Sequence, residues 1–119
     1  MPETKTYIGG CHCGKVRYEV TTDLDKVVSC NCSHCSKRGM LPSFVPADRF
    51  TLRSGEDALA TYRFNTGKIA HLFCRSCGIE SFATGQGPDG SEMVAVNARC
   101  LDDVDIAALT LTPFNGKDY

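Results

Sequence analysis

The sequence lacks any apolar run close to the roughly 20 residues that a membrane-spanning helix needs. Its first ten residues, MPETKTYIGG, also lack the apolar centre of a secretory signal. A strong charge of one sign is missing as well, because the formal net charge of the 119 residues is -1 and no basic run exceeds the pair Lys37 and Arg38. These absences argue against membrane and nucleic-acid partners, and we expect a soluble cytoplasmic protein.

Helical patterns are scarce, and short segments rich in β-branched and aromatic residues dominate instead. In 15–20 (KVRYEV), for example, Val16, Tyr18 and Val20 fall on one face of a strand. Turn residues separate the segments, so the sequence predicts an all-β, mostly antiparallel fold in a single domain spanning residues 1–119. The predicted strands are 15–20, 50–53, 59–65, 69–73, 80–84 and 93–101, and short helical turns are expected at 46–49 and 102–109.

Cysteine is abundant, with eight residues in the chain. Without an export signal the thiols are expected to stay reduced, which favours metal ligation over a disulfide framework. Seven of the eight fall into closely spaced groups, and the spacings are not those of ferredoxin iron–sulfur motifs, so zinc is the expected metal. The groups are Cys11 and Cys13, then Cys30, Cys32 and Cys35, then Cys74 and Cys77.

The first and last groups predict one closed zinc site. Residues i and i+2 of an extended segment share a face, so Cys11 and Cys13 can bind one ion together. A turn lets Cys74 and Cys77 converge, and Gly78 can adopt the positive φ that such a turn often requires. Four thiolates leave no position for a substrate, so this zinc is expected to be structural. The alternative, a redox CxxC pair, lacks the surrounding βαβ pattern of thioredoxin-like proteins.

The middle group offers only three thiolates, Cys30, Cys32 and Cys35, and predicts a second zinc with an open position. Three thiolates make that zinc a poor Lewis acid but suit it to a soft ligand such as a substrate thiol, which coordination would deprotonate. The expected chemistry is thiol activation with carbon–sulfur bond making or breaking. Because three ligands hold an ion less firmly than four, this second zinc is expected to be lost more easily on purification.

Several neighbours bear on whether the second site stays open. Lys37 and Arg38 are candidate partners for carboxylates of a thiol substrate, or a solvated basic pair. Closure by Cys100 or His34 would make both zincs structural. The alternation in 93–101 instead places Cys100 on a buried face as an inert thiol, His34 is expected to point outward from its turn, and His71 is expected on a strand face.

The motifs GGCHCGKVRYEV (9–20), CNCSHCSKRG (30–39), FCRSCGIESF (73–82) and VNARCLDDVD (96–105) occur in an order that resembles the glutathione-dependent formaldehyde-activating enzyme family, which includes the centromere protein V-like zinc proteins. The resemblance implies a β-tent fold, and it implies a carbon–sulfur lyase that forms S-hydroxymethylglutathione reversibly from glutathione and formaldehyde. It also implies two zincs per chain, a structural one on Cys11, Cys13, Cys74 and Cys77 and a second one, associated with the glutathione sulfur, on Cys30, Cys32 and Cys35.

The alternative function is a non-enzymatic, zinc-stabilised binding module in which both metals are structural. The sequence leaves open the thiol, the aldehyde, the direction of reaction and whether the chain forms a homo-oligomer.

Overall fold

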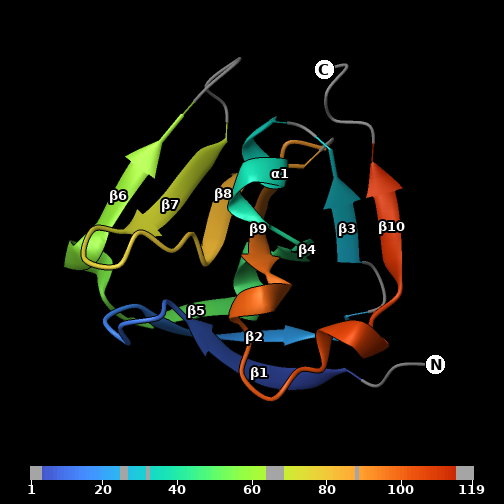
Figure 1. Ribbon diagram of the computed structural model, residues 1–119, viewed down its shortest axis with the longest axis horizontal. Coiled ribbons are helices and arrows are strands. Elements are labelled where there is room, and N and C mark those ends of the chain that lie inside the picture. Colours follow the sequence, from blue (N-terminus) through green and yellow to red (C-terminus); the bar gives the residue numbers. More distant parts are fainter. Residues whose placement is uncertain (1–3, 25–26, 32, 64–68, 88, 115–119) are drawn as a thin grey trace.

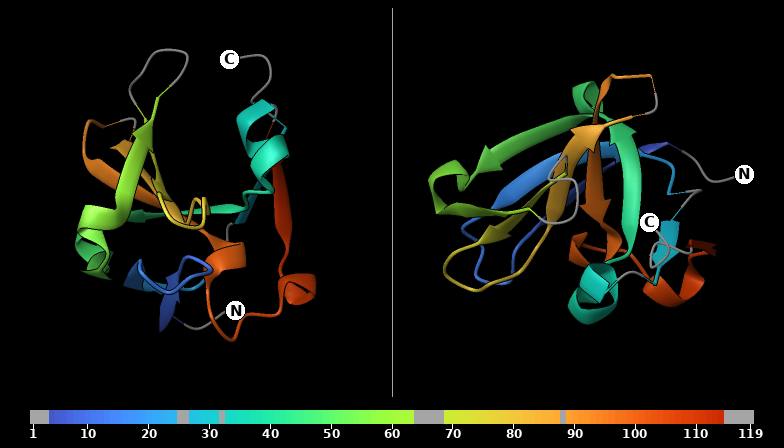
Figure 2. Two further views of the ribbon diagram at one scale, coloured as in Figure 1. Left: turned by 60° about the vertical axis from the view of Figure 1, so that its left-hand side comes forward. Right: turned by 90° about the horizontal axis from the view of Figure 1, so that it is seen from above.

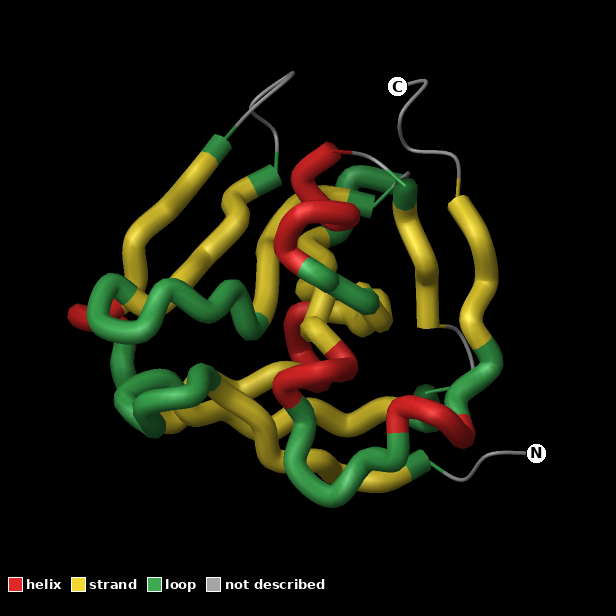
Figure 3. Tube along the Cα trace, in the orientation of Figure 1, coloured by secondary structure: helices red, strands yellow, loops and turns green. Residues whose placement is uncertain are grey.

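The structure is a computed structural model that describes residues 4–24, 27–31, 33–63, 69–87 and 89–114. Its described strands form three sheets, which confirms the predicted all-β class (Figure 1). Figure 2 shows the same arrangement from two other sides, and Figure 3 shows how little helix accompanies the strands. None of the described helices is long and apolar enough to cross a membrane.

The first sheet is antiparallel and has the order β1 (Lys5–Gly10), β2 (Arg17–Thr22) and β5 (Phe50–Ser54). It crosses the lower part of the view in Figure 1. The predicted one-sided face is confirmed, because Val16, Tyr18 and Val20 all have 0% exposure. The strand β1 was not predicted.

The second sheet is antiparallel and has five strands in the order β4-β9-β8-β7-β6. Four of its strands match predicted ones with shifted ends, although part of the predicted strand 59–65 lies outside the described residues. The bounds are β4 (Pro42–Pro46), β9 (Glu92–Asn97), β8 (Phe82–Gln86), β7 (Ala70–Cys74) and β6 (Leu59–Tyr62).

The strand β9 ends four residues earlier than predicted, because Asn97 starts a 3-10 turn, η3 (Ala98–Cys100). The Asn97 side-chain oxygen accepts hydrogen bonds from the backbone N–H of Arg99 (3.1 Å) and of Leu41 (3.2 Å). Asparagine favours such local side-chain-to-backbone bonds, which compete with strand pairing. The prediction that Cys100 continues the alternation of the strand was therefore wrong.

The third sheet is a pair formed by β3 (Val27–Cys30) and β10 (Leu111–Phe114), and these two strands are parallel. The predicted, mostly antiparallel arrangement is confirmed by the two larger sheets, and this parallel pair is the exception among the described strands. Antiparallel neighbours are commonly joined by a short hairpin, whereas β3 and β10 come from opposite halves of the chain, so no hairpin fixes their direction.

Short helices complete the described fold. The expected helical turns are confirmed as η1 (Ala47–Arg49) and η4 (Ile106–Ala108), and η2 (Glu56–Ala58) precedes β6. One α-helix, α1 (Ser33–Arg38), carries Cys35 of the middle cysteine group, where no helix was predicted from the sequence.

An aromatic cluster joins the two larger sheets in the core. The Tyr18 ring lies 4.9 Å from Phe50 and 5.7 Å from Phe82, measured between centroids. The Tyr18 hydroxyl donates a hydrogen bond of 2.9 Å to the backbone carbonyl of Ser81. This contact fixes β2 against the start of β8, and both of these strands adjoin segments that carry cysteines.

Candidate metal centres and pocket

Four cysteines from two distant parts of the chain meet in one cluster. Cys11 and Cys13 lie in the turn that follows β1, whereas Cys74 ends β7 and Cys77 lies in the next turn. The Cys13 sulfur is 3.6 Å from the sulfurs of Cys11 and Cys74, and all four sulfurs lie within 4.8 Å of one another. Their predicted convergence is confirmed.

The geometry of this cluster fits a tetrahedral zinc ion. Zinc–sulfur bonds of about 2.3 Å require sulfurs about 3.8 Å apart, close to the observed 3.6 Å. The backbone supports the arrangement: the N–H of Gly78 donates to the Cys74 carbonyl (2.8 Å), and Gly78 has φ 79°, as predicted from its position after the CxxC. The expectation that Cys11 and Cys13 share a strand face was wrong, because the chain turns there, with Gly14 at φ 84°.

The thiols of this cluster titrate together. Burial opposes ionisation of Cys77, but hydrogen bonds involving the backbone of Cys13 and Ile79 and the neighbouring thiols lower its pKa to about 6. At Cys13 a backbone hydrogen bond lowers the pKa, while burial and the three neighbouring thiols raise it, to about 11. The first proton of the cluster is therefore lost easily, whereas the last one is lost only at high pH because the thiolates already formed repel a further negative charge. A divalent cation bound to the sulfurs would cancel this repulsion.

The predicted three-cysteine site is described only in part. Cys30 ends β3 and Cys35 lies in α1, whereas Cys32 lies outside the described residues. The Cys35 side chain packs against Met40 and Ala83. The set of three ligands therefore stays a prediction.

Cys100 lies beside Glu80. Its thiol donates a long hydrogen bond (3.8 Å) to the Glu80 backbone carbonyl. Burial, together with the negative charge of Cys11, Cys77 and Glu80, raises the pKa of Cys100 to about 11. Cys100 is thus a protonated thiol at neutral pH.

His34 was expected to point outward, and this was wrong, because its side chain is only 7% exposed. Its Nε2 lies 2.9 Å from Glu80 Oε1, and His71 Nδ1 lies 3.0 Å from Glu80 Oε2. His71 occupies a strand face of β7, as predicted, and the two imidazole rings are 4.1 Å apart between centroids. Burial lowers the pKa of His34, with the Glu80 carboxylate acting in the opposite direction.

Sequence reasoning missed this His34–His71–Glu80 cluster. The three residues come from α1, from β7 and from the segment before β8. No local spacing links them, so only the fold brings them together.

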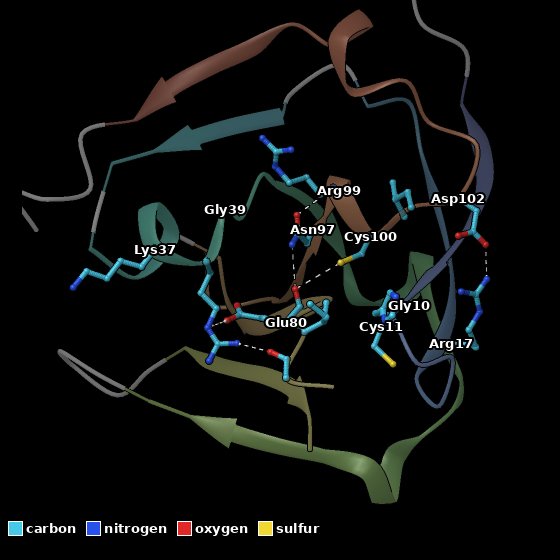
Figure 4. A pocket seen from close by; sticks show the side chains of 15 residues that line it. Gly10, Cys11, Arg17, Lys37, Gly39, Glu80, Asn97, Arg99, Cys100 and Asp102 are labelled. Carbon is cyan, nitrogen blue, oxygen red and sulfur yellow. Dashed lines mark hydrogen bonds and ion pairs between the residues drawn. The ribbon is translucent and has the colours of Figure 1, made fainter. Parts of the chain in front are cut away.

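An open pocket of about 770 Å³ lies between the turn of Cys11 and the end of α1 (Figure 4). Its basic lining residues are Arg17, Lys37, Arg38 and Arg99, and its acidic ones are Glu80 and Asp102.

These basic side chains are not equally available to a ligand. Arg17 forms an ion pair with Asp102, whereas the Arg99 side chain forms no ion pair with any residue in the described part of the chain. In Figure 4 the end of the Lys37 side chain points away from Cys100 and Glu80. Among the three arginines that line the pocket, Arg99 is therefore the one whose side chain is least engaged by other described residues.

The chain matches the family described as glutathione-dependent formaldehyde-activating enzyme over residues 6–115. A crystal structure of a Rhodobacter sphaeroides protein is similar to it, with a TM-score of 0.77 and 31% sequence identity, over 89% of this chain and 97% of that one.

Proposed function

Because the chain belongs to the glutathione-dependent formaldehyde-activating enzyme family, we propose that it is a zinc-dependent carbon–sulfur lyase. It adds a low-molecular-weight thiol, glutathione, reversibly to a small aldehyde such as formaldehyde. The observation that carries this proposal is the basic pocket of about 770 Å³, which lies within the size range of small-molecule sites and is lined by Cys11 and by Lys37 and Arg38, which follow the middle cysteine group.

Two groups of thiolates have separate roles in this proposal. Cys11, Cys13, Cys74 and Cys77 hold a structural zinc, as their sulfur–sulfur distances support. Cys30, Cys32 and Cys35 hold the second zinc, whose open position would keep a substrate thiol as its thiolate.

The pocket would bind the rest of the substrate. Arg99 and Arg38 line it, and they would pair with the carboxylates of glutathione, with Lys37 at its outer edge. The thiolate sulfur forms a bond to the aldehyde carbon, the carbonyl electrons move to oxygen, and that oxygen takes up the proton that the thiol gave up. The reverse reaction breaks the same carbon–sulfur bond, and no oxidant or reductant is needed.

We place this reaction in the cytoplasm, where thiols stay reduced, and in one domain with a small-molecule partner. The near-neutral net charge agrees with such a partner and gives no reason to expect nucleic acid.

Calorimetry of glutathione binding to the zinc-loaded protein tests the proposal. Wild type and the exposed control Ser36→Ala should bind equally, and Cys32→Ser should lose binding together with the second zinc. The rate of S-hydroxymethylglutathione formation, followed by NMR, should fall with it. Equal binding by Cys32→Ser would contradict the open site and favour the non-enzymatic module in which both metals are structural.

A further inference from the structure

Three buried side chains that the proposed thiol chemistry does not use converge beneath α1. The Glu80 carboxylate, 1% exposed, directs one oxygen to His34 and the other to His71, at 2.9 and 3.0 Å. The ligand atoms of all three residues lie within 4.8 Å of one another. Two imidazoles and a carboxylate are the donor set of many three-ligand transition-metal sites.

Hydrogen bonding explains the position of only one of the two Glu80 carboxylate oxygens. His71 Nδ1 and Glu80 Oε2 are aligned as a hydrogen-bonded pair. Glu80 Oε1, in contrast, receives no well-aligned hydrogen bond from the described residues, and the nearest guanidinium, that of Arg38, is 3.8 Å away. A fully buried carboxylate oxygen in this situation is costly unless a cation lies close to it.

The cluster is separate from the thiolate ligands. Adjacent residues of an α-helix point about 100° apart, so His34 and Cys35 cannot face the same ion from neighbouring positions of α1 without distortion. Cys35 indeed packs against Met40 and Ala83, whereas the His34 ring stacks with Tyr62 at 5.9 Å.

We propose that His34, His71 and Glu80 bind one divalent transition-metal ion through nitrogen and oxygen, in addition to the thiolate-bound zincs. Zn²⁺, Fe²⁺ and Co²⁺ suit this donor set, and three protein ligands leave positions open for water or a small ligand. Glu80 lines the pocket of about 770 Å³, which provides a path for the ion. In the metal-free state the positive charge of the Arg38 guanidinium partly balances the negative charge of the Glu80 carboxylate. When the ion binds, the guanidinium would have to move away from that carboxylate.

Cobalt titration tests this site in protein that carries Zn²⁺ on its cysteine ligands only, after excess Zn²⁺, which would itself occupy the nitrogen and oxygen ligands, has been removed by dialysis. Zn²⁺ should remain on the thiolates, which favour it over Co²⁺. We expect one Co²⁺ per chain to bind with weak visible absorption and without the intense thiolate-to-cobalt charge-transfer band. His71→Ala and Glu80→Gln should weaken this binding by at least about tenfold, and the exposed carboxylate control Glu92→Gln should not.

The chain has three histidines, which gives a readout in the wild-type protein should the variants fail to fold. Co²⁺ should broaden or shift the ring-proton NMR signals of His34 and His71 before that of His12, which is exposed. Absence of Co²⁺ uptake, unchanged uptake in both folded variants, or broadening led by His12 would overturn the proposal. Glutathione binding by the same zinc-loaded sample is measured separately, so failure of this site and failure of the proposed function are distinguishable.

Discussion

Loss of both ligands of the CxxC pair from the four-cysteine cluster should destabilise the whole fold. In the double variant Cys74→Ser/Cys77→Ser the zinc would no longer join the turn after β1 to the end of β7. Cys13 and Cys74 are 61 residues apart in sequence, and the loop-closure entropy of a cross-link of that length corresponds to about 4 kcal/mol. Small domains have a total unfolding free energy of about 5–15 kcal/mol, so this one contact represents a large share of it.

Denaturant titration of the zinc-loaded proteins measures this effect. The unfolding midpoint of Cys74→Ser/Cys77→Ser should fall far below that of wild type, and a chelator should lower the wild-type midpoint by a similar amount while hardly affecting the double variant. Cys100→Ser is the control, because Cys100 makes one long hydrogen bond and lies outside the cluster. A wild-type midpoint that does not respond to complete zinc removal would refute the structural role.

Three further predictions concern single side chains. In metal-free protein, iodoacetamide should label Cys77 already at neutral pH and Cys100 only as the pH approaches 11, because thiols react as thiolates and their pKa values are about 6 and about 11; peptide mass spectrometry measures both rates. Arg99→Gln should weaken glutathione binding about tenfold by calorimetry, whereas Arg53→Gln, outside the pocket, should not. Tyr18→Phe should lower the unfolding free energy by about 1 kcal/mol, because the Ser81 carbonyl loses one buried hydrogen bond and keeps the one from the Asn97 N–H, and an unchanged denaturation midpoint would contradict this.

Local sequence patterns predicted the strands that bury one face in the core and expose the other. The alternation of Val16, Tyr18 and Val20 identified a buried strand face, because the side chains of a strand point alternately to opposite sides. The strand of Leu111–Phe114 carries no such signal: all four of its residues are exposed, and its parallel partner β3 lies far away in the sequence. Its existence depends on tertiary pairing, which a local pattern does not encode.

The two candidate metal centres that the structure describes also differ in whether local sequence spacing predicts them. Cys74 and Cys77 are close in sequence, and one tight turn between them can direct both sulfurs at one ion. Their spacing alone therefore predicts this half of the four-cysteine site. His34, His71 and Glu80 converge only after a short helix is placed against the strand β7 and the segment before β8. Such a buried polar cluster is costly unless every charge is balanced. The cation proposed for it therefore follows from the fold, and no spacing of residues along the chain could have predicted it.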